Sequence, residues 1–246
     1  MKAERKMNIA LIGYGKMGKV IEEIAISRGH RITEKISSTH PIEKADLSNT
    51  DIAIEFSTPG FVIKHIEHCI ANDVPVIVGT TAWNDQLDYV KELVLERKGS
   101  LLYASNFSVG VNIFFDINRR LAKLMSSHND YDVAIEEIHH TQKLDAPSGT
   151  AVSLANDLLF ENENLNSWVH EEEQAPNVKP GQVGVTSFRK KDVPGTHIIK
   201  YASEIDEIEI KHTAFNRKGF ALGAVIAAEW LVNKKGIYTM QDVIKF

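Results

Sequence analysis

Residues 7–18, MNIALIGYGKMG, decide the fold of this chain. The first seven, MNIALIG, form a short apolar run that ends in glycine, which is typical of a strand buried on both faces of a sheet. GYGKMG then matches G-x-G-x-x-G at Gly13, Gly15 and Gly18, and apolar residues recur at helical spacing directly after it. A strand before the glycines and a helix after them predict a site for a dinucleotide pyrophosphate. The alternative is a purely structural turn between strand and helix.

Each glycine has a distinct predicted task. Gly13 allows the tight turn, Gly15 lets the backbone approach the pyrophosphate, and Gly18 lets the helix pack closely on the strand. The intervening residues belong to the same predicted cofactor loop; they are Tyr14, Lys16 and Met17.

Strands and helices alternate through the first 108 residues. Strand-like runs at 30–37, 51–57, 75–81 and 100–108 are separated by helical patterns, and Thr58 with Pro59 suits the start of one helix. This alternation predicts an α/β fold, a Rossmann-like doubly wound parallel sheet. Ligands bind beyond the carboxyl ends of such strands, so the segments that follow the strands should meet at one cleft. These segments are Gly13–Gly18, Ser57–Thr58, Gly79–Thr81 and Ala104–Phe107.

The pattern changes from about residue 109. We expect a helix over 112–128 with Ile113, Ile117, Leu121 and Leu124 on one face, a strand over 131–140, and a helix from 149. A polar surface loop is expected over 161–182. Three strands between 183 and 214 have no helices between them, which indicates a second α+β domain on an open mixed or antiparallel sheet. The last segment, 219–244, is expected to be helical with a break at Gly236. The predicted domains are 1–108 with 216–246, and 109–215.

Composition restricts the classes of protein that need to be considered. The chain has 246 residues and a net charge of −5, so we expect no general attraction to nucleic acid or an anionic membrane. No apolar run is long enough to span a bilayer, and the first residues lack the pattern of a signal peptide. The single cysteine, Cys69, excludes an internal disulfide and is expected in the core. We therefore expect a cytoplasmic enzyme or binding protein.

The stretch 137–151, EIHHTQKLDAPSGTA, gathers groups that carry or accept protons. Histidine can donate a proton near neutral pH, and Lys143 supplies a positive charge or a second proton. Pro147–Thr150 opens a helix whose free N–H groups, with the Thr150 hydroxyl, would bind an anion. An acid, a cation and a carboxylate site are the parts needed to reduce an acidic substrate by hydride transfer.

Structural alternatives exist for the same residues. Asp145 lies among turn formers, and the structural alternative for it is a cap or turn residue. Two adjacent histidines are often simply exposed. A metal pair is disfavoured, because neighbours on a strand point to opposite faces and no cysteine or carboxylate cluster completes a tetrahedral set. We expect no metal.

The stretch 137–151 closely resembles the signature of the dihydrodipicolinate reductase family, E-x-H-H-x-x-K-x-D-A-P-S-G-T-A. GYGKMG, VGTT, SNFSVGVN and DVPGTH resemble further motifs of that family and occur in its order, over nearly the whole chain. The resemblance implies NADH- or NADPH-dependent reduction of 4-hydroxy-tetrahydrodipicolinate to tetrahydrodipicolinate in lysine and diaminopimelate synthesis. It also implies a small dicarboxylate substrate and a homotetramer joined through the second domain.

The resemblance also assigns residues. It implies that His139 is the general acid/base and that Lys143 is the proton donor or orients the substrate. His140, Gly149 and Thr150 would bind a substrate carboxylate. The cofactor pyrophosphate would lie on Gly13–Gly18. The nicotinamide side would be lined by Gly79, Thr80, Thr81, Ala104, Ser105, Asn106 and Phe107.

Two positions depart from the family pattern. Many members carry an acidic residue after the second strand, where this chain has Ser37 and Ser38, and many carry arginine where it has Thr58. An acidic residue at that place selects NADH, so its absence predicts that NADPH is used at least as well, with Ser37, Lys35 or Lys16 near the extra phosphate.

Two other functions remain open. One is another two-domain dehydrogenase that acts on an amino-acid-like substrate, and the other is a nucleotide-sensing module without catalysis. A substrate panel separates the first, and cofactor binding without oxidation would indicate the second.

Overall fold

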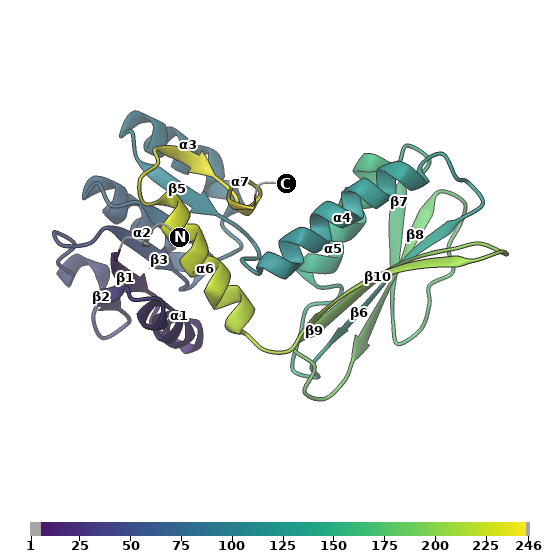
Figure 1. Cartoon of the computed structure of the whole chain (residues 1–246), viewed down its shortest axis with the longest axis horizontal. Coiled ribbons are helices and arrows are strands. Elements are labelled where there is room, and N and C mark those ends of the chain that lie inside the picture. Colours follow the sequence, from purple (N-terminus) through teal and green to yellow (C-terminus); the bar gives the residue numbers. More distant parts are fainter. Residues whose placement is uncertain (1–5, 245–246) are drawn as a thin grey trace. The chain divides into compact units, whose positions relative to one another are not determined.

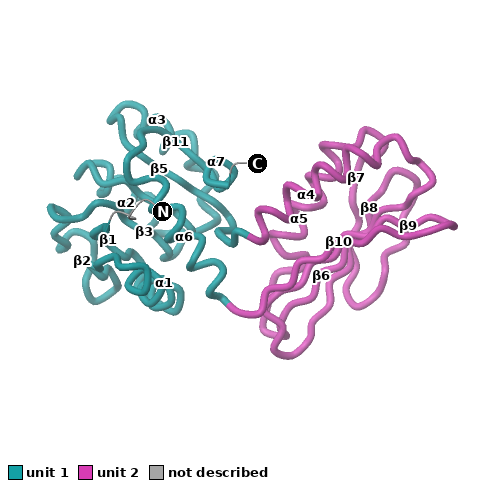
Figure 2. Tube along the Cα trace, viewed as in Figure 1, with its two compact units in different colours: residues 1–109, 217–246 teal, residues 110–216 magenta. Residues whose placement is uncertain are grey.

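The computed structural model describes residues 6–244 and separates into two compact units (Figure 2). The first unit runs to Val109 and resumes at Arg217, and the second is Gly110–Asn216. Residues 1–5, part of the segment considered above for a signal peptide, lie outside the described residues. No helix among the described residues is long and apolar enough to cross a membrane.

The first unit is built on a six-stranded sheet in the order β11-β5-β4-β3-β1-β2 (Figure 1). All its pairings are parallel, so the predicted Rossmann-like doubly wound sheet is confirmed. Its strands are β1 (Asn8–Ile12), β2 (Arg31–Ile36), β3 (Ile52–Glu55), β4 (Val76–Val78), β5 (Ser100–Tyr103) and β11 (Gly236–Tyr238).

Helices cover both faces of this sheet because successive side chains of a strand point to opposite faces. Ile9 and Leu11 of β1 enter one buried cluster with α1 and α6, whereas Ala10 and Ile12 enter a second cluster with α2 and α3. Cys69 is fully buried in the second cluster, as predicted. The helices of this unit are α1 (Lys16–Ser27), η1 (Ile42–Lys44), α2 (Pro59–Ala71), η2 (Asn84–Gln86), α3 (Leu87–Glu96), α6 (Lys218–Leu231) and α7 (Met240–Val243).

One expectation for this unit was wrong in part. The segment 219–244 breaks as expected, but Gly236–Tyr238 forms β11 beside β5, and only the short helix α7 follows it. Three residues carry too little periodicity to be recognised as a strand, and only the pairing with β5 defines this one.

The second unit is a five-stranded mixed sheet in the order β10-β9-β6-β8-β7, which confirms the predicted open mixed sheet. β6 lies at its centre, antiparallel to β9 and parallel to β8. Two helices pack their apolar side chains on one face of the sheet. The elements are α4 (Val109–Met125), β6 (Asp132–His139), α5 (Gly149–Glu161), β7 (Ser167–Glu172), β8 (Gln182–Arg189), β9 (Gly195–Ala202) and β10 (Glu207–Ala214).

Two details of this unit differ from expectation. The predicted loop 161–182 contains the edge strand β7, which is half-exposed and shows little apolar alternation. The apolar face of α4 is also not its buried face, since Ile113, Ile117 and Leu124 are 36%, 44% and 70% exposed. The buried face instead holds Val111, Phe114, Asn118, Ala122 and Met125. Asn118 donates from Nδ2 to the carbonyl of Leu154 at 3.1 Å, whereas its Oδ1 is buried without a hydrogen-bond partner among the described residues.

Candidate active site

The glycine loop has the geometry that a close-approaching anion requires. Gly13 has φ +89°, and a Cβ there would lie 2.2 Å from the carbonyl oxygen of Phe56, so no other residue fits. A Cβ on Gly18 would lie 2.7 Å from the Gly13 carbonyl oxygen. A Cβ on Gly15 would meet nothing within 4 Å, which leaves open space at the start of α1. No side chain caps this helix and no acidic residue lies in its first turn, so its N–H groups are available to a phosphate.

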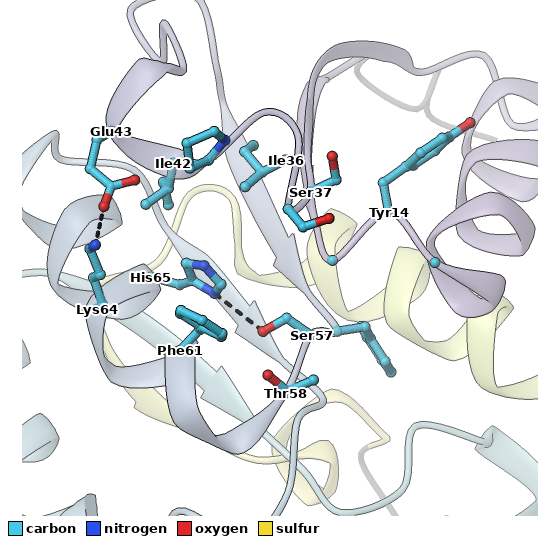
Figure 3. A pocket seen from close by; sticks show the side chains of 15 residues that line it. Tyr14, Ile36, Ser37, Ile42, Glu43, Ser57, Thr58, Phe61, Lys64 and His65 are labelled. Carbon is cyan, nitrogen blue, oxygen red and sulfur yellow. Dashed lines mark hydrogen bonds and ion pairs between the residues drawn. The ribbon is translucent and has the colours of Figure 1, made fainter.

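This loop forms one wall of a pocket of about 560 Å³ (Figure 3). The predicted residues Gly13, Tyr14, Gly15 and Ser37 all line it. Helix α2 contributes the opposite wall, where the rings of Phe61 and His65 are stacked at 6.2 Å. The remaining lining residues are Ile36, Ser38, Pro41, Ile42, Glu43, Phe56, Ser57, Thr58 and Lys64. Its volume, apolar walls and free helix N-terminus suit the adenosine and phosphate portion of a dinucleotide.

A buried carboxylate shapes the strand end beneath this pocket. Glu55, at the end of β3, is fully buried and accepts a hydrogen bond from the Ser57 hydroxyl. Its Oε1 also lies 3.2 Å from Nδ1 of His65. The Ser57 N–H donates to Thr80 Oγ1 at 2.8 Å, which ties the end of β3 to the segment after β4. These contacts hold the Ser57–Thr58 turn in place.

A second, smaller pocket of about 240 Å³ gathers another set of predicted residues, namely Met17, Gly79, Thr80 and Thr81. Phe56 and Ser57 line both pockets. A Cβ on Gly79 would lie 2.2 Å from the Phe56 ring, so this glycine is needed for the packing of Phe56.

The other predicted cofactor residues line neither pocket. Lys16 is exposed, and Gly18 is buried against the glycine loop. Phe107 is buried, with its ring 5.5 Å from that of Phe56. The rest of the segment after β5 is Ala104, Ser105 and Asn106, of which Asn106 accepts the Ser108 N–H at 2.9 Å.

Charged side chains near the larger pocket are already paired. Lys35 Nζ lies 2.6 Å from Glu22 Oε1 and 4.9 Å from the centre of the Tyr14 ring, so this lysine already has an ion-pair partner on α1. Lys64 forms an ion pair with Glu43, and both line the pocket (Figure 3). The sequence prediction had not included Lys64 among the cofactor residues. Its position on the helix that follows the third strand is the sequence feature that could have identified it.

In the second unit, the proton-carrying residues lie at the end of the central strand. Glu137 and His139 are two residues apart on β6, so both point to the same, helix-covered face. Strand register adds their neighbours: Glu137 lies opposite Ser187 of β8 and His197 of β9. Glu137 is fully buried, and His139 is 8% exposed.

Glu137 is held as a buried carboxylate by a ring of donors. Its Oε1 accepts from the Ser187 hydroxyl at 2.6 Å, the Ser148 N–H at 3.1 Å and Arg189 Nη1 at 3.4 Å. Its Oε2 lies 3.0 Å from Nδ1 of His139. Burial by itself raises the pKa of Glu137, but the contact with His139 and the hydrogen bonds from Ser148 and Ser187 outweigh it and keep the pKa well below its usual range.

His197 closes the cluster and is neutral. Burial, followed by the proximity of His139, lowers its pKa from 6.5 to about 3. Its Nε2 lies 3.1 Å from the Ser148 hydroxyl oxygen, and its ring meets that of His139 edge-on at 5.1 Å. Glu137, His139 and His197 offer atoms within 4.8 Å of one another, a spacing that a cation could use. Arg189 already supplies the positive charge that balances Glu137.

The loop after β6 presents a lysine near this cluster. Lys143 Nζ binds both oxygens of Asp145 at 2.8 and 2.7 Å. Asp145 is therefore the partner of the lysine, in addition to being a turn former. Arg189 Nη2 donates to the carbonyl of Asp145 at 2.8 Å and so braces the same loop from β8.

The predicted carboxylate site lies at the start of α5. Ser148 caps the helix, accepting the Ala151 N–H at 3.2 Å, and no acidic residue lies in the first turn. A Cβ on Gly149 would meet nothing within 4 Å, so the backbone there is open to a ligand, and Thr150 follows it. Nδ1 of His140 is buried and lacks a hydrogen-bond partner among the described residues. These features fit an anionic group.

The sequence prediction assigned no role to Glu137, Ser187, Arg189 or His197. Glu137 begins the quoted stretch and His197 ends DVPGTH, so both lay within recognised motifs. Ser187 and Arg189 have no motif of their own and become neighbours only through strand register.

Comparisons with known proteins agree on one family. Residues 7–107 match the model of the dihydrodipicolinate reductase N-terminus, and residues 110–244 match that of its C-terminus. The chain is 48% identical over 240 residues to the 4-hydroxy-tetrahydrodipicolinate reductase of Christiangramia forsetii, covering 97% of this chain and 98% of the relative. It is 35% identical to the enzyme of the same name from Thermosipho africanus, with 97% and 98% covered.

A solved structure shows the same fold. The dipicolinate-bound dihydrodipicolinate reductase of Paenisporosarcina sp. TG-14 aligns with a TM-score of 0.74 at 22% identity, over 98% of this chain and all of that one. Two family models that together span both units, and a full-length relative at 48% identity, lead to one conclusion. This chain belongs to the dihydrodipicolinate reductase family.

Proposed function

We propose that the chain reduces 4-hydroxy-tetrahydrodipicolinate to tetrahydrodipicolinate with NADPH or NADH, in lysine and diaminopimelate biosynthesis in the cytoplasm. The reaction takes up one hydride and one proton and releases one water. The observation that carries the proposal is the cluster at the end of β6, where His139 lies 3.0 Å from a buried carboxylate and is followed by Lys143 and an open helix N-terminus. Family membership supports the same reaction.

The first unit is proposed to hold the cofactor. The open space at Gly15 and the uncapped start of α1 would accept the pyrophosphate, with the adenosine in the larger pocket. Met17, Gly79, Thr80 and Thr81, which line the smaller pocket, would contact the nicotinamide side. When bound, the nicotinamide supplies the hydride.

The second unit is proposed to hold the substrate and deliver the proton. The N–H groups at Gly149 and Thr150 and the unpartnered Nδ1 of His140 would bind a carboxylate. His139 would act as the general acid, and Lys143 as a proton donor or orienting cation. Positive groups close to the dicarboxylate would stabilise negative charge that develops in the transition state.

We also propose that NADPH is used at least as well as NADH. Ser37 and Ser38 line the pocket where an acidic residue would select NADH. Glu34 faces away toward His40, at 3.0 Å, and the lining carboxylate of Glu43 is neutralised by Lys64. Both Lys35 and Lys64 have carboxylate partners, but only Lys64 lines the pocket, so Lys64 is the better placed cation for the extra phosphate.

The assembly proposed is a homotetramer joined through the second unit. Its sheet has open edges at β7 and β10, and its two helices pack on one face only. Open edges and an uncovered face favour association. Light scattering at assay concentration tests this proposal, and a monomer would contradict it.

A coupled assay tests the reaction. The substrate is generated in the cuvette, and the loss of NADPH absorbance is followed for wild type, His139→Ala and Lys143→Ala. We expect each variant to lose about a hundredfold or more in turnover. NADPH affinity, measured by fluorescence, should be nearly unchanged, because neither residue lines the cofactor pockets.

The outcomes separate the alternatives. Oxidation only with amino-acid-like substrates would indicate a different dehydrogenase. NADPH binding without oxidation would indicate a sensing module. Near-wild-type turnover in both variants would remove His139 and Lys143 from the mechanism.

A further inference from the structure

We propose that Glu137 is a positioning residue that sets the tautomer of His139, keeping the hydrogen on Nδ1 and leaving Nε2 as the atom that exchanges protons with the substrate. The inference rests on the proposed role of His139 as the general acid. It adds a residue that acts through His139 rather than on the substrate.

The two oxygens of Glu137 have separate tasks. Oε1 accepts from the Ser187 hydroxyl, the Ser148 N–H and the Arg189 guanidinium, at 2.6 to 3.4 Å. Oε2 lies 3.0 Å from Nδ1 of His139 and 3.8 Å from Nε2 of His197. Both Oε2 and Nδ1 are buried, and neither has a well-aligned hydrogen bond to any described residue, so this ion-pair contact is the interaction open to both atoms. A carboxylate can only accept hydrogen bonds, so a hydrogen bond across this contact requires the hydrogen on Nδ1.

The surroundings keep this arrangement in place. Glu137 and His139 lie on the same face of one strand, and the edge-on contact with His197 confines the imidazole ring. At the other ring nitrogen, a Cβ on Gly195 would lie 3.0 Å from Nε2. Glycine at this position therefore leaves Nε2 uncovered, as a proton-transferring atom requires.

The substitution Glu137→Gln tests the idea without changing the shape of the side chain. Three donors surround the Oε1 position, so the amide oxygen is expected to take that place. The amide NH₂ group then occupies the Oε2 position and points a donor at Nδ1. His139 must respond by making Nδ1 the acceptor and moving its hydrogen to Nε2.

This reversal should impair proton transfer more than ligand binding. When His139 is an imidazolium, its Nδ1–H would face the amide NH₂ group of the variant, which cannot accept a hydrogen bond. The charged form of His139 is then no longer stabilised. We expect turnover to fall by about a hundredfold to ten-thousandfold. KM and the affinities for NADPH and for pyridine-2,6-dicarboxylate, an inert substrate mimic, should change little.

Glu136→Gln is the matched control. It makes the same chemical change on the same strand, one residue away on the opposite face. We expect it to keep wild-type turnover. Thermal unfolding of both variants identifies any loss of folded protein.

Nitrogen NMR of isotope-labelled histidine gives a readout that a purely structural role would not move. The His139 signals are assigned by their absence in His139→Ala. In wild type we expect neutral His139 as the Nδ1–H tautomer, and in Glu137→Gln as the Nε2–H tautomer. The wild-type spectrum alone tests the proposal if the variant does not fold.

Four outcomes decide the matter. An Nε2–H tautomer in wild type overturns the proposal, as does Glu137→Gln with wild-type turnover. A loss of turnover with the expected tautomer change supports it. A wild-type protein that shows the Nδ1–H tautomer but does not reduce 4-hydroxy-tetrahydrodipicolinate would contradict the proposed function and leave the role of Glu137 toward His139 intact.

Discussion

Gly15→Ala should separate cofactor binding from folding. Gly15 caps α1 with φ −93° and ψ −148°, just outside the extended region that alanine prefers, and a Cβ there meets no atom within 4 Å. The free protein should therefore accept the methyl group at a backbone cost of about 1–3 kcal/mol in the free energy of unfolding. The same methyl group would occupy the space where a pyrophosphate approaches the start of α1.

The expected loss of NADPH affinity follows from the hydrogen bonds to the pyrophosphate that the methyl group would prevent. Hydrogen bonds to a charged group contribute about 1.5–3 kcal/mol each. Holding the pyrophosphate away from one N–H of the first turn should raise the Kd for NADPH by about tenfold to a hundredfold, since about 1.4 kcal/mol corresponds to a factor of ten.

Fluorescence titration with NADPH and thermal unfolding measure the two quantities. Gly219→Ala is the control, because Gly219 lies in the first turn of α6, outside both pockets, where a Cβ would have an ordinary contact of 3.6 Å with Ser108. Wild-type NADPH affinity in Gly15→Ala would refute the assignment of the pyrophosphate to this loop. Loss of folded protein in Gly15→Ala would show that the open space has a structural role instead.

Three further predictions concern the cofactor, stability and proton transfer. Ser37→Asp and Ser38→Asp should each shift the ratio of kcat/KM values toward NADH, because both line the pocket and the new charge repels the extra phosphate of NADPH; a wild-type enzyme that strongly prefers NADH would contradict this. His197 is neutral in the folded protein, because its pKa is lowered from 6.5 to about 3. Between these two pH values the unfolded chain binds a proton at His197 and the folded protein does not, so the free energy of unfolding falls as the pH drops through this range. His197→Asn should remove this component, up to about 1.4 kcal/mol per pH unit, and an unchanged acid dependence in urea unfolding would exclude it. Gly195→Ala should lower kcat about tenfold or more by crowding Nε2 of His139 without changing the NADPH Kd, and wild-type kcat would argue that Nε2 is not the reacting atom.

Local pattern was sufficient for most of the architecture. The glycine spacing after an apolar strand predicted the Gly13–Gly18 loop, because only glycine tolerates a φ of +89° with a carbonyl 2.2 Å from its Cβ position. Thr58 and Pro59 predicted the start of α2, and Ser148 lies where a helix cap was needed. These signals act within a few residues, so they can be read from sequence.

Elements defined by distant partners could not be predicted in this way. β7 and β11 are short or polar, and they are strands because β8 and β5 provide partners for their backbones. Helix α4 carries two stripes at helical spacing. The more apolar stripe is exposed. The helix packs on its own unit through the other stripe, which carries Phe114, Ala122 and Asn118.

The same distinction between local pattern and distant partners applies to the candidate site. The sequence alone determined that His139, Lys143 and the start of α5 lie together, since they are neighbours in the chain. Only the tertiary structure placed Ser187, Arg189 and His197 around Glu137, because the register of β8 and β9 against β6 makes them neighbours. That register depends on burial of one face of the whole sheet, and a shift by one residue would turn Glu137 and His139 away from their partners.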